Sequence, residues 1–88
     1  MTPSINHRPA QGRRGGSFDL ERDGKRIGYL SYSLVEGETM TIDYVQVDPS
    51  LQGSGLGAKL VAAAVHWARE QNHKVVPICG FAKAVLRR

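Results

Sequence analysis

The sequence has 88 residues, 41% of them hydrophobic, and a net charge of +4, which suits one small domain and no more. It contains no run of 18 apolar residues, so we expect no membrane-spanning segment. Its N-terminus lacks an apolar signal segment, and its single cysteine excludes both an internal disulfide and a cysteine-based zinc site. We therefore expect a cytoplasmic protein without a bound metal.

Much of the positive charge is in residues 1–16, which contain Arg8, Arg13 and Arg14 and no acidic residue. The rest of the chain has nine basic and eight acidic residues, so its net charge is only +1. Residues 1–16 are rich in Pro, Gly, Asn and Gln, which bury too little apolar surface to become ordered. We predict a disordered basic tail over residues 1–16, with nucleic acid not expected as its partner, followed by one domain over residues 17–88.

Three strands are predicted in the first half of this domain, over residues 17–22, 25–34 and 39–47. Asp23-Gly24 between the first two is typical of a two-residue hairpin turn. In the third strand, simple alternation puts Met40, Ile42 and Tyr44 on one face and Val45 and Val47 on the other, as in a central strand. Short turns between the strands predict an antiparallel three-strand meander.

A proline and a run of glycines follow the third strand. Pro49 ends the strand, and Gly53, Gly55 and Gly57 precede an amphipathic helix over residues 55–71. A strand, a glycine turn and a helix N-terminus together point free backbone N–H groups at one place, where the helix dipole favours an anion. Because glycine has no Cβ, a phosphate can approach the backbone closely. The segment is therefore interpreted as a phosphate-binding loop.

Two common phosphate loops fit this segment poorly. A P-loop needs Lys followed by Ser or Thr directly after its last glycine, but Lys59 follows Gly57 after one residue. A dinucleotide-binding loop read from Gly53 needs an acidic residue near position 77, and none is present.

After the helix, residues 74–79 predict a short parallel strand that Pro77 interrupts, and residues 81–87 predict a short helix. The fold class is therefore α+β, with the meander, a glycine loop, a long helix, a parallel closing strand and a short C-terminal helix.

Gln52-Gly53-Ser54-Gly55-Leu56-Gly57 matches the pattern [Q/R]-x-x-G-x-[G/A], and Val47-Asp48-Pro49 precedes it. In these segments the chain resembles the GNAT superfamily of N-acetyltransferases, whose members bind acyl-CoA at this loop. The segment from Lys74 to Ala82 is similar to the P-x-C-x-F closing segment of a branch of short members. The resemblance covers residues 17–86 and implies acetyl-CoA as cosubstrate and a small-molecule or peptide amine as acceptor.

The resemblance also implies where the cosubstrate binds. The N–H of Val45 would face the thioester carbonyl and that of Val47 the pantetheine, as in strand pairing. The loop would hold the pyrophosphate through Gln52, Gly53, Ser54, Gly55, Leu56 and Gly57.

Two residues are candidates for catalysis. Cys79 resembles the cysteine of the short branch and precedes the last predicted helix, where a helix N-terminus lowers a thiol pKa. It would be acetylated as a covalent intermediate, line the acetyl pocket, or be inert. Asp43 is the candidate general base, because alternation puts it on the Val45 side of the central strand.

One departure from the superfamily leaves alternatives open. The short Asp23-Gly24 turn leaves no room for the helices that build the acceptor pocket in most members. The acceptor site would then be shallow, built by the partner chain of a homodimer, or absent. A non-catalytic acyl-CoA binding or sensing module, and a small interaction domain with a basic tail, remain alternatives to the N-acetyltransferase.

Overall fold

The computed structural model describes residues 3–9, 14–36 and 38–87. Five strands, a 3-10 turn and two helices follow one another in the order β1 (Ser4–Pro9), β2 (Gly15–Arg22), β3 (Lys25–Val35), β4 (Thr39–Val47), η2 (Pro49–Leu51), α1 (Leu56–Glu70), β5 (Lys74–Pro77) and α2 (Gly80–Leu86).

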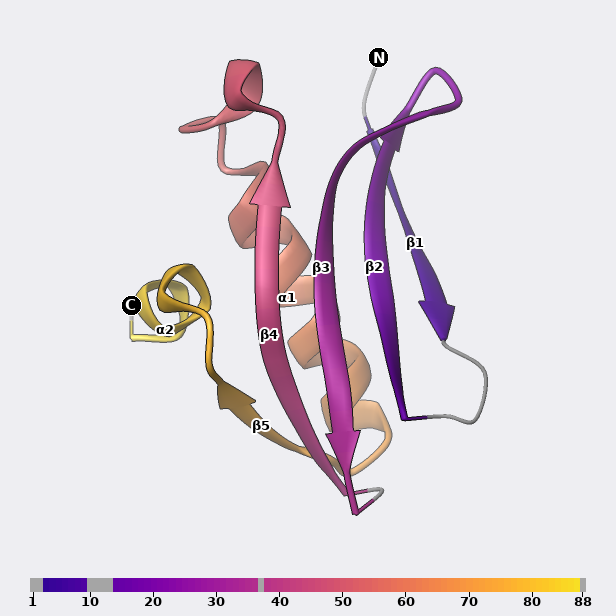
Figure 1. Ribbon diagram of the computed structural model, residues 1–88, viewed down its shortest axis with the longest axis vertical. Helices are drawn as coiled ribbons and strands as arrows, with labels where there is room; N and C mark the ends of the chain where they lie inside the picture. Colours follow the sequence, from indigo (N-terminus) through magenta and orange to yellow (C-terminus); the bar gives the residue numbers. More distant parts are fainter. Residues whose placement is uncertain (1–2, 10–13, 37, 88) are drawn as a thin grey trace.

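The strands form one sheet in which spatial order equals chain order. β1 to β4 pair antiparallel, and β5 pairs parallel to β4. The β2–β3 turn uses positive φ angles at Asp23 (54°) and Gly24 (76°), as the hairpin prediction required. Helix α1 lies behind the sheet in Figure 1 and α2 lies beside the end of β5. The predicted α+β class, glycine loop, long helix, parallel closing strand and short C-terminal helix are confirmed.

The core lies between α1 and one face of the sheet. From α1 the apolar stripe buries Leu60, Val61, Ala64 and Ala68. The sheet contributes fully or nearly fully buried side chains from every strand of the predicted meander: Phe18, Leu20, Ile27, Leu30, Tyr32, Met40 and Ile42. Each large apolar side chain buried in this way stabilises the fold by about 1.5–3 kcal/mol. This single layer of contacts holds α1, and with it the loop that precedes α1, against β4.

The predicted disordered tail is wrong for residues 4–9 and for residues 15–16, which begin β2. Residues 4–9 form β1, which pairs with β2 from Ser4↔Glu21 to Pro9↔Gly16. The ring of His7 stacks on Phe18 with the centroids 4.3 Å apart, and Arg8 Nε lies 2.9 Å from the Asp19 carboxylate. Backbone pairing, stacking and an ion pair together order a segment whose own composition is polar. Residues 1–2 and 10–13 of the predicted tail lie outside the described residues.

A β-bulge at Asp43 corrects the predicted alternation in β4. Ser31 pairs with Tyr44 and Tyr32 pairs with Ile42, so Asp43 is the extra residue. The alternation reverses after the bulge. Val45 and Val47 therefore pack on the same core as Met40 and Ile42, whereas Tyr44 points away from it and is 51% exposed.

The opposite face of the sheet, which is nearest the viewer in Figure 1, carries no helix among the described residues. Side chains of alternate residues in β2, β3 and β4 project from it into solvent. We call it the open face. Neither of the two described helices is long and apolar enough to cross a lipid bilayer.

Candidate active site

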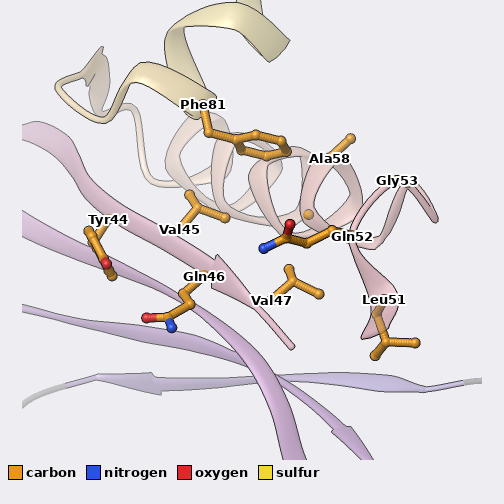
Figure 2. Close-up of a pocket in the computed structure, with 11 residues that line it drawn as sticks. Tyr44, Val45, Gln46, Val47, Leu51, Gln52, Gly53, Ala58 and Phe81 are labelled. Carbon is orange, nitrogen blue, oxygen red and sulfur yellow. The ribbon is translucent and has the colours of Figure 1, made fainter. Parts of the chain in front are cut away.

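A pocket of about 650 Å³ lies between the second half of β4, the loop before α1, and α2. A volume of this size suits a cofactor-sized ligand. Figure 2 shows Val45, Val47 and Gln52 facing the space beneath the Phe81 ring, while Tyr44 and Gln46 project from the opposite side of β4. The lining residues are Tyr44, Val45, Gln46, Val47, Leu51, Gln52, Gly53, Gly55, Gly57, Ala58 and Phe81, none of which carries a charge.

The loop that closes one end of the pocket is built from local turns. Asp48 caps η2 by accepting hydrogen bonds from the N–H of Ser50 (3.0 Å) and from its hydroxyl (2.8 Å). These bonds lower the pKa of the Asp48 carboxyl below its usual range. Gly53 (φ 84°) and Gly55 (φ 85°) then adopt left-handed conformations that L side chains rarely take. Two such residues turn the chain from β4 into α1.

This turn leaves backbone donors free at the pocket. The first helical hydrogen bond of α1 runs from the N–H of Lys59 to the carbonyl of Gly55. Among the described residues, the N–H groups of Gly53, Gly55, Gly57 and Ala58 have no backbone acceptor, as expected ahead of and within a first helical turn. Those four residues all line the pocket. The 15-residue helix directs the positive end of its dipole to the same place.

A fork between β4 and β5 opens the other end of the site. Their pairing ends at Ile42↔Pro77, and the N–H groups of both Ile78 and Cys79 donate to the Ile42 carbonyl (3.0 Å each). Beyond this point no strand within residues 3–9, 14–36 or 38–87 pairs with β4 on its β5 side. The N–H of Val45 points into the fork, where it helps to lower the pKa of the Cys79 thiol, and alternation points the N–H of Val47 to the same side.

The thiol of Cys79 lies beside this fork, although Cys79 is not among the residues that line the pocket. Burial by itself raises its pKa, but the nearby backbone N–H groups of Ala82, Phe81 and Val45 favour the thiolate and outweigh burial, so the net shift of the pKa is downward. A lowered pKa means more thiolate at neutral pH and a more reactive sulfur. The structure therefore places Cys79 near the backbone amide of Val45, the amide that by resemblance would face the thioester carbonyl.

Asp43 does not line the pocket. Because of the bulge, its side chain lies on the open face, opposite Val45, and the prediction that the two share a side is wrong. Its carboxylate accepts hydrogen bonds from the Ser33 hydroxyl (2.5 Å) and the Thr41 hydroxyl (2.9 Å). The structure thus brings Cys79 and Val45 together and leaves Asp43 on the other side of the strand.

Of the eight residues predicted to hold the cosubstrate, six line the pocket and two, Ser54 and Leu56, do not. Ser54 instead supports the turn, since its hydroxyl donates to the Leu51 carbonyl (2.5 Å). The sequence did not identify Phe81 as a site residue, although its ring covers the pocket. A Cβ on Gly57 would come within 2.8 Å of that ring, so glycine lets Phe81 approach α1. The closing segment contained Phe81, but only the fold shows that it faces the loop.

The described residues include no cluster of three His, Cys, Asp or Glu side chains that could hold a metal ion. The polar groups at the site include backbone amides, the Gln52 side-chain amide, the Cys79 thiol and, across the strand, the Asp43 carboxylate.

Comparison with known proteins agrees with this geometry. A model of the GCN5-related N-acetyltransferase family matches residues 17–88, so the chain belongs to that family. None of the curated proteins matches the sequence.

Solved structures show the same fold. A GCN5-like protein from Staphylococcus aureus is 32% identical, with a TM-score of 0.68, over 96% of this chain and 78% of that one. IAA acetyltransferase from Bacillus cereus is 23% identical, with a TM-score of 0.67, over 80% of this chain and 60% of that one. An aminoglycoside N-acetyltransferase in complex with CoA is 21% identical, with a TM-score of 0.70, over 88% of this chain and 67% of that one. The chain spans less than two thirds of the Bacillus cereus protein.

Proposed function

We propose that this chain is an acetyl-CoA-dependent N-acetyltransferase that moves an acetyl group from the thioester to an amine. The observation that carries the proposal is the pocket itself, which has free backbone N–H groups at the loop and extends along β4 to Val45, beside the strand fork and the Cys79 thiol. Family membership and a similarly folded acetyltransferase that binds CoA support the same cosubstrate.

The neutral lining explains how a diphosphate would be bound. With no Lys or Arg among the lining residues, the negative charge would be held by the N–H groups of Gly53, Gly55, Gly57 and Ala58 and by the dipole of α1. Gln52 supplies a side-chain amide that faces the same space. The pantetheine would then run along β4 and pair with Val47 in place of a neighbouring strand.

Direct acetyl transfer at the fork would proceed by attack of the amine on the thioester. The lone pair of the amine attacks the thioester carbonyl carbon, a C–N bond forms, and the C–S bond breaks. CoA leaves as a thiolate and takes up one proton, and the amine nitrogen loses one. The N–H of Val45 would stabilise the oxyanion that develops on the carbonyl oxygen, a contribution of about 2.7–4 kcal/mol in acyl transfer.

Cys79 would act as a nucleophile or as part of the acetyl pocket, and Asp43 would act as the general base. The Cys79 thiolate either attacks the thioester first, giving an acetyl-cysteine that the amine then opens, or lines the acetyl pocket during direct transfer. Its sulfur lies near the N–H of Val45, the donor that the thioester carbonyl would also use. Asp43 would accept the amine proton from the open face, with its carboxylate oriented by Ser33 and Thr41.

The test is release of free CoA from acetyl-CoA in the presence of a panel of amines, with N-acetylation of the amine confirmed by mass. The proposal predicts CoA release that depends on an amine, and an intact mass 42 Da higher at Cys79 if the two-step route operates. Binding of CoA without turnover of any amine would favour a non-catalytic acyl-CoA binding module. That second candidate is supported by one observation, the absence of a carboxylate or imidazole from the pocket lining.

A nucleic-acid role for the N-terminal segment receives less support. Arg8, one of its three arginines, is paired with Asp19 and Glu21 and is not free for phosphates. A cytoplasmic location accords with the single cysteine, and a homodimer remains a prediction.

A further inference from the structure

The open face contains a carboxylate that no cation neutralises. Asp43 is half-buried on this face, its oxygens accept hydrogen bonds from Ser33 and Thr41, and it forms no ion pair with a Lys, Arg or His among the described residues. Asp19, which projects from the same face, is instead paired with Arg8 and Arg26. A half-buried carboxylate without a counter-ion gains free energy from a cation that reaches it, because burial has removed part of its hydration.

Exposed apolar side chains lie around this carboxylate. Tyr44, the next residue in β4, is 51% exposed. Val76, 45% exposed, is on β5 directly opposite Thr41, and Ile78, 56% exposed, lies two residues beyond it where β5 leaves β4. Large apolar side chains that remain this exposed close together mark a surface that binds something apolar.

The patch and the proposed cosubstrate pocket meet at β4. The Tyr44 side chain projects from the open face, and Tyr44 is also among the residues that line the pocket. Asp43 is only two residues along β4 from Val45, whose N–H points into the fork. The pocket and the open face lie on opposite sides of β4, so two substrates could reach the fork from its two sides without competing for space.

We propose, building on the acetyltransferase function above, that the acceptor is a small primary amine with an apolar body. Its ammonium binds the Asp43 carboxylate, and its alkyl or aryl part packs on Tyr44, Val76 and Ile78. The charge of Asp43 selects the amine, and the three apolar side chains select its body.

The test measures amine binding separately from turnover. Protein saturated with CoA is titrated with 2-phenylethylamine while the methyl signals of Val76 and Ile78 are followed by NMR. We expect saturable shifts at both residues, and dissociation constants about tenfold higher for ethanolamine, which lacks the apolar body, and for 2-phenylethanol, which lacks the ammonium. Shifts elsewhere only, or equal affinity for the three compounds, would overturn the proposal. Tighter binding of a lysine-containing peptide would overturn it as well.

Two matched variants localise the effect. Asp43→Asn keeps the shape of the side chain and an acceptor oxygen for one of the two hydroxyls but removes the charge, so we expect the dissociation constant for 2-phenylethylamine to rise about tenfold. Asp23→Asn makes the same change in the β2–β3 turn, where the positive φ of 54° suits asparagine, and should leave that constant unchanged. If both variants bind the amine like the wild type, the acceptor site is not at Asp43.

This test can fail independently of the enzyme proposal. Calorimetry with CoA reports on the pocket, and Asp43→Asn should bind CoA as the wild type does. Loss of CoA binding by the wild type would remove the acetyltransferase proposal itself. Turnover of amines with an unchanged amine affinity in Asp43→Asn would remove only the acceptor site on the open face.

Discussion

Replacing Gly55 by alanine tests whether the left-handed turn is used to bind phosphate. Gly55 has φ 85° and lines the pocket, and no heavy atom lies within 4 Å of the position that a Cβ would take. The mutation therefore introduces no clash inside the protein. It forces an L side chain into a conformation that costs roughly 1–2 kcal/mol. For a domain of this size, each kcal/mol lowers the melting temperature by about 4–8 °C.

The added methyl group also affects the ligand. It projects from the turn where a phosphate oxygen would approach the backbone N–H groups of the loop. One hydrogen bond to a charged group is worth about 1.5–3 kcal/mol. Gly55→Ala should therefore raise the dissociation constant for CoA roughly 10- to 100-fold, measured by calorimetry at a temperature where the variant is folded.

Gly24→Ala is the matched control. Gly24 has φ 76°, also has no heavy atom within 4 Å of a Cβ, and lies in the β2–β3 turn outside the pocket. It should lose as much stability as Gly55→Ala and bind CoA like the wild type. If the two variants bound CoA equally well, the loop would not be the phosphate site.

Three further predictions follow from the site and the core. The rate of Cys79 alkylation by iodoacetamide should reach half its maximum at a pH below the usual thiol pKa of about 8.5, and acetyl-CoA should slow the alkylation. A midpoint pH above that value would show that the amides of Val45, Phe81 and Ala82 do not stabilise the thiolate. Burial lowers the pKa of His7 in the folded protein, so the neutral ring stabilises the fold above the unfolded-state pKa of about 6.5, and this stability is lost as the pH falls below that value. His7→Phe should therefore reduce the fall in melting temperature between pH 7.5 and 5. An unchanged slope would assign that fall to other groups. Phe81 is 45% exposed, so Phe81→Ala should cost only about 1–2 kcal/mol of stability. Because the ring lines the pocket, the same variant should bind CoA more weakly, and an unaltered CoA affinity would show that the ring is not part of the cosubstrate site.

The parts of the fold that local patterns encode could be predicted from the sequence. The β2–β3 turn needs positive φ angles that Asp23-Gly24 supplies, and the stripe that includes Leu60 and Ala64 specifies the buried face of α1. Pro49 ends β4, and the glycines that follow it form the turn that leads into α1. Each of these signals depends on residues a few positions apart, so no tertiary contact was needed to find them.

Two features depended on contacts between distant segments. β1 is polar and gains its order from pairing with β2 and from the stacking of His7 on Phe18, neither of which its own composition shows. The bulge at Asp43 is defined by the register between β3 and β4. Simple alternation therefore put Tyr44 in the core and Asp43 beside Val45, and the structure reverses both.

The same bulge shapes the site. It turns Val45 and Val47 toward the pocket and leaves Asp43 and Tyr44 on the open face, so that the two sides of β4 have different chemistry. One inserted residue thus separates a neutral, amide-lined pocket from a face with a carboxylate and exposed apolar side chains.

Titration of isotopically labelled protein with CoA, followed through backbone amide signals, tests the central claim most directly. If the free N–H groups of the loop bind the diphosphate, the signals of Gly53, Gly55 and Gly57 move together and saturate, and that of Val47 moves with them as the pantetheine pairs with β4. If those glycine signals stay in place while the protein remains folded, the loop does not bind the cosubstrate and the proposed acetyl transfer has no site.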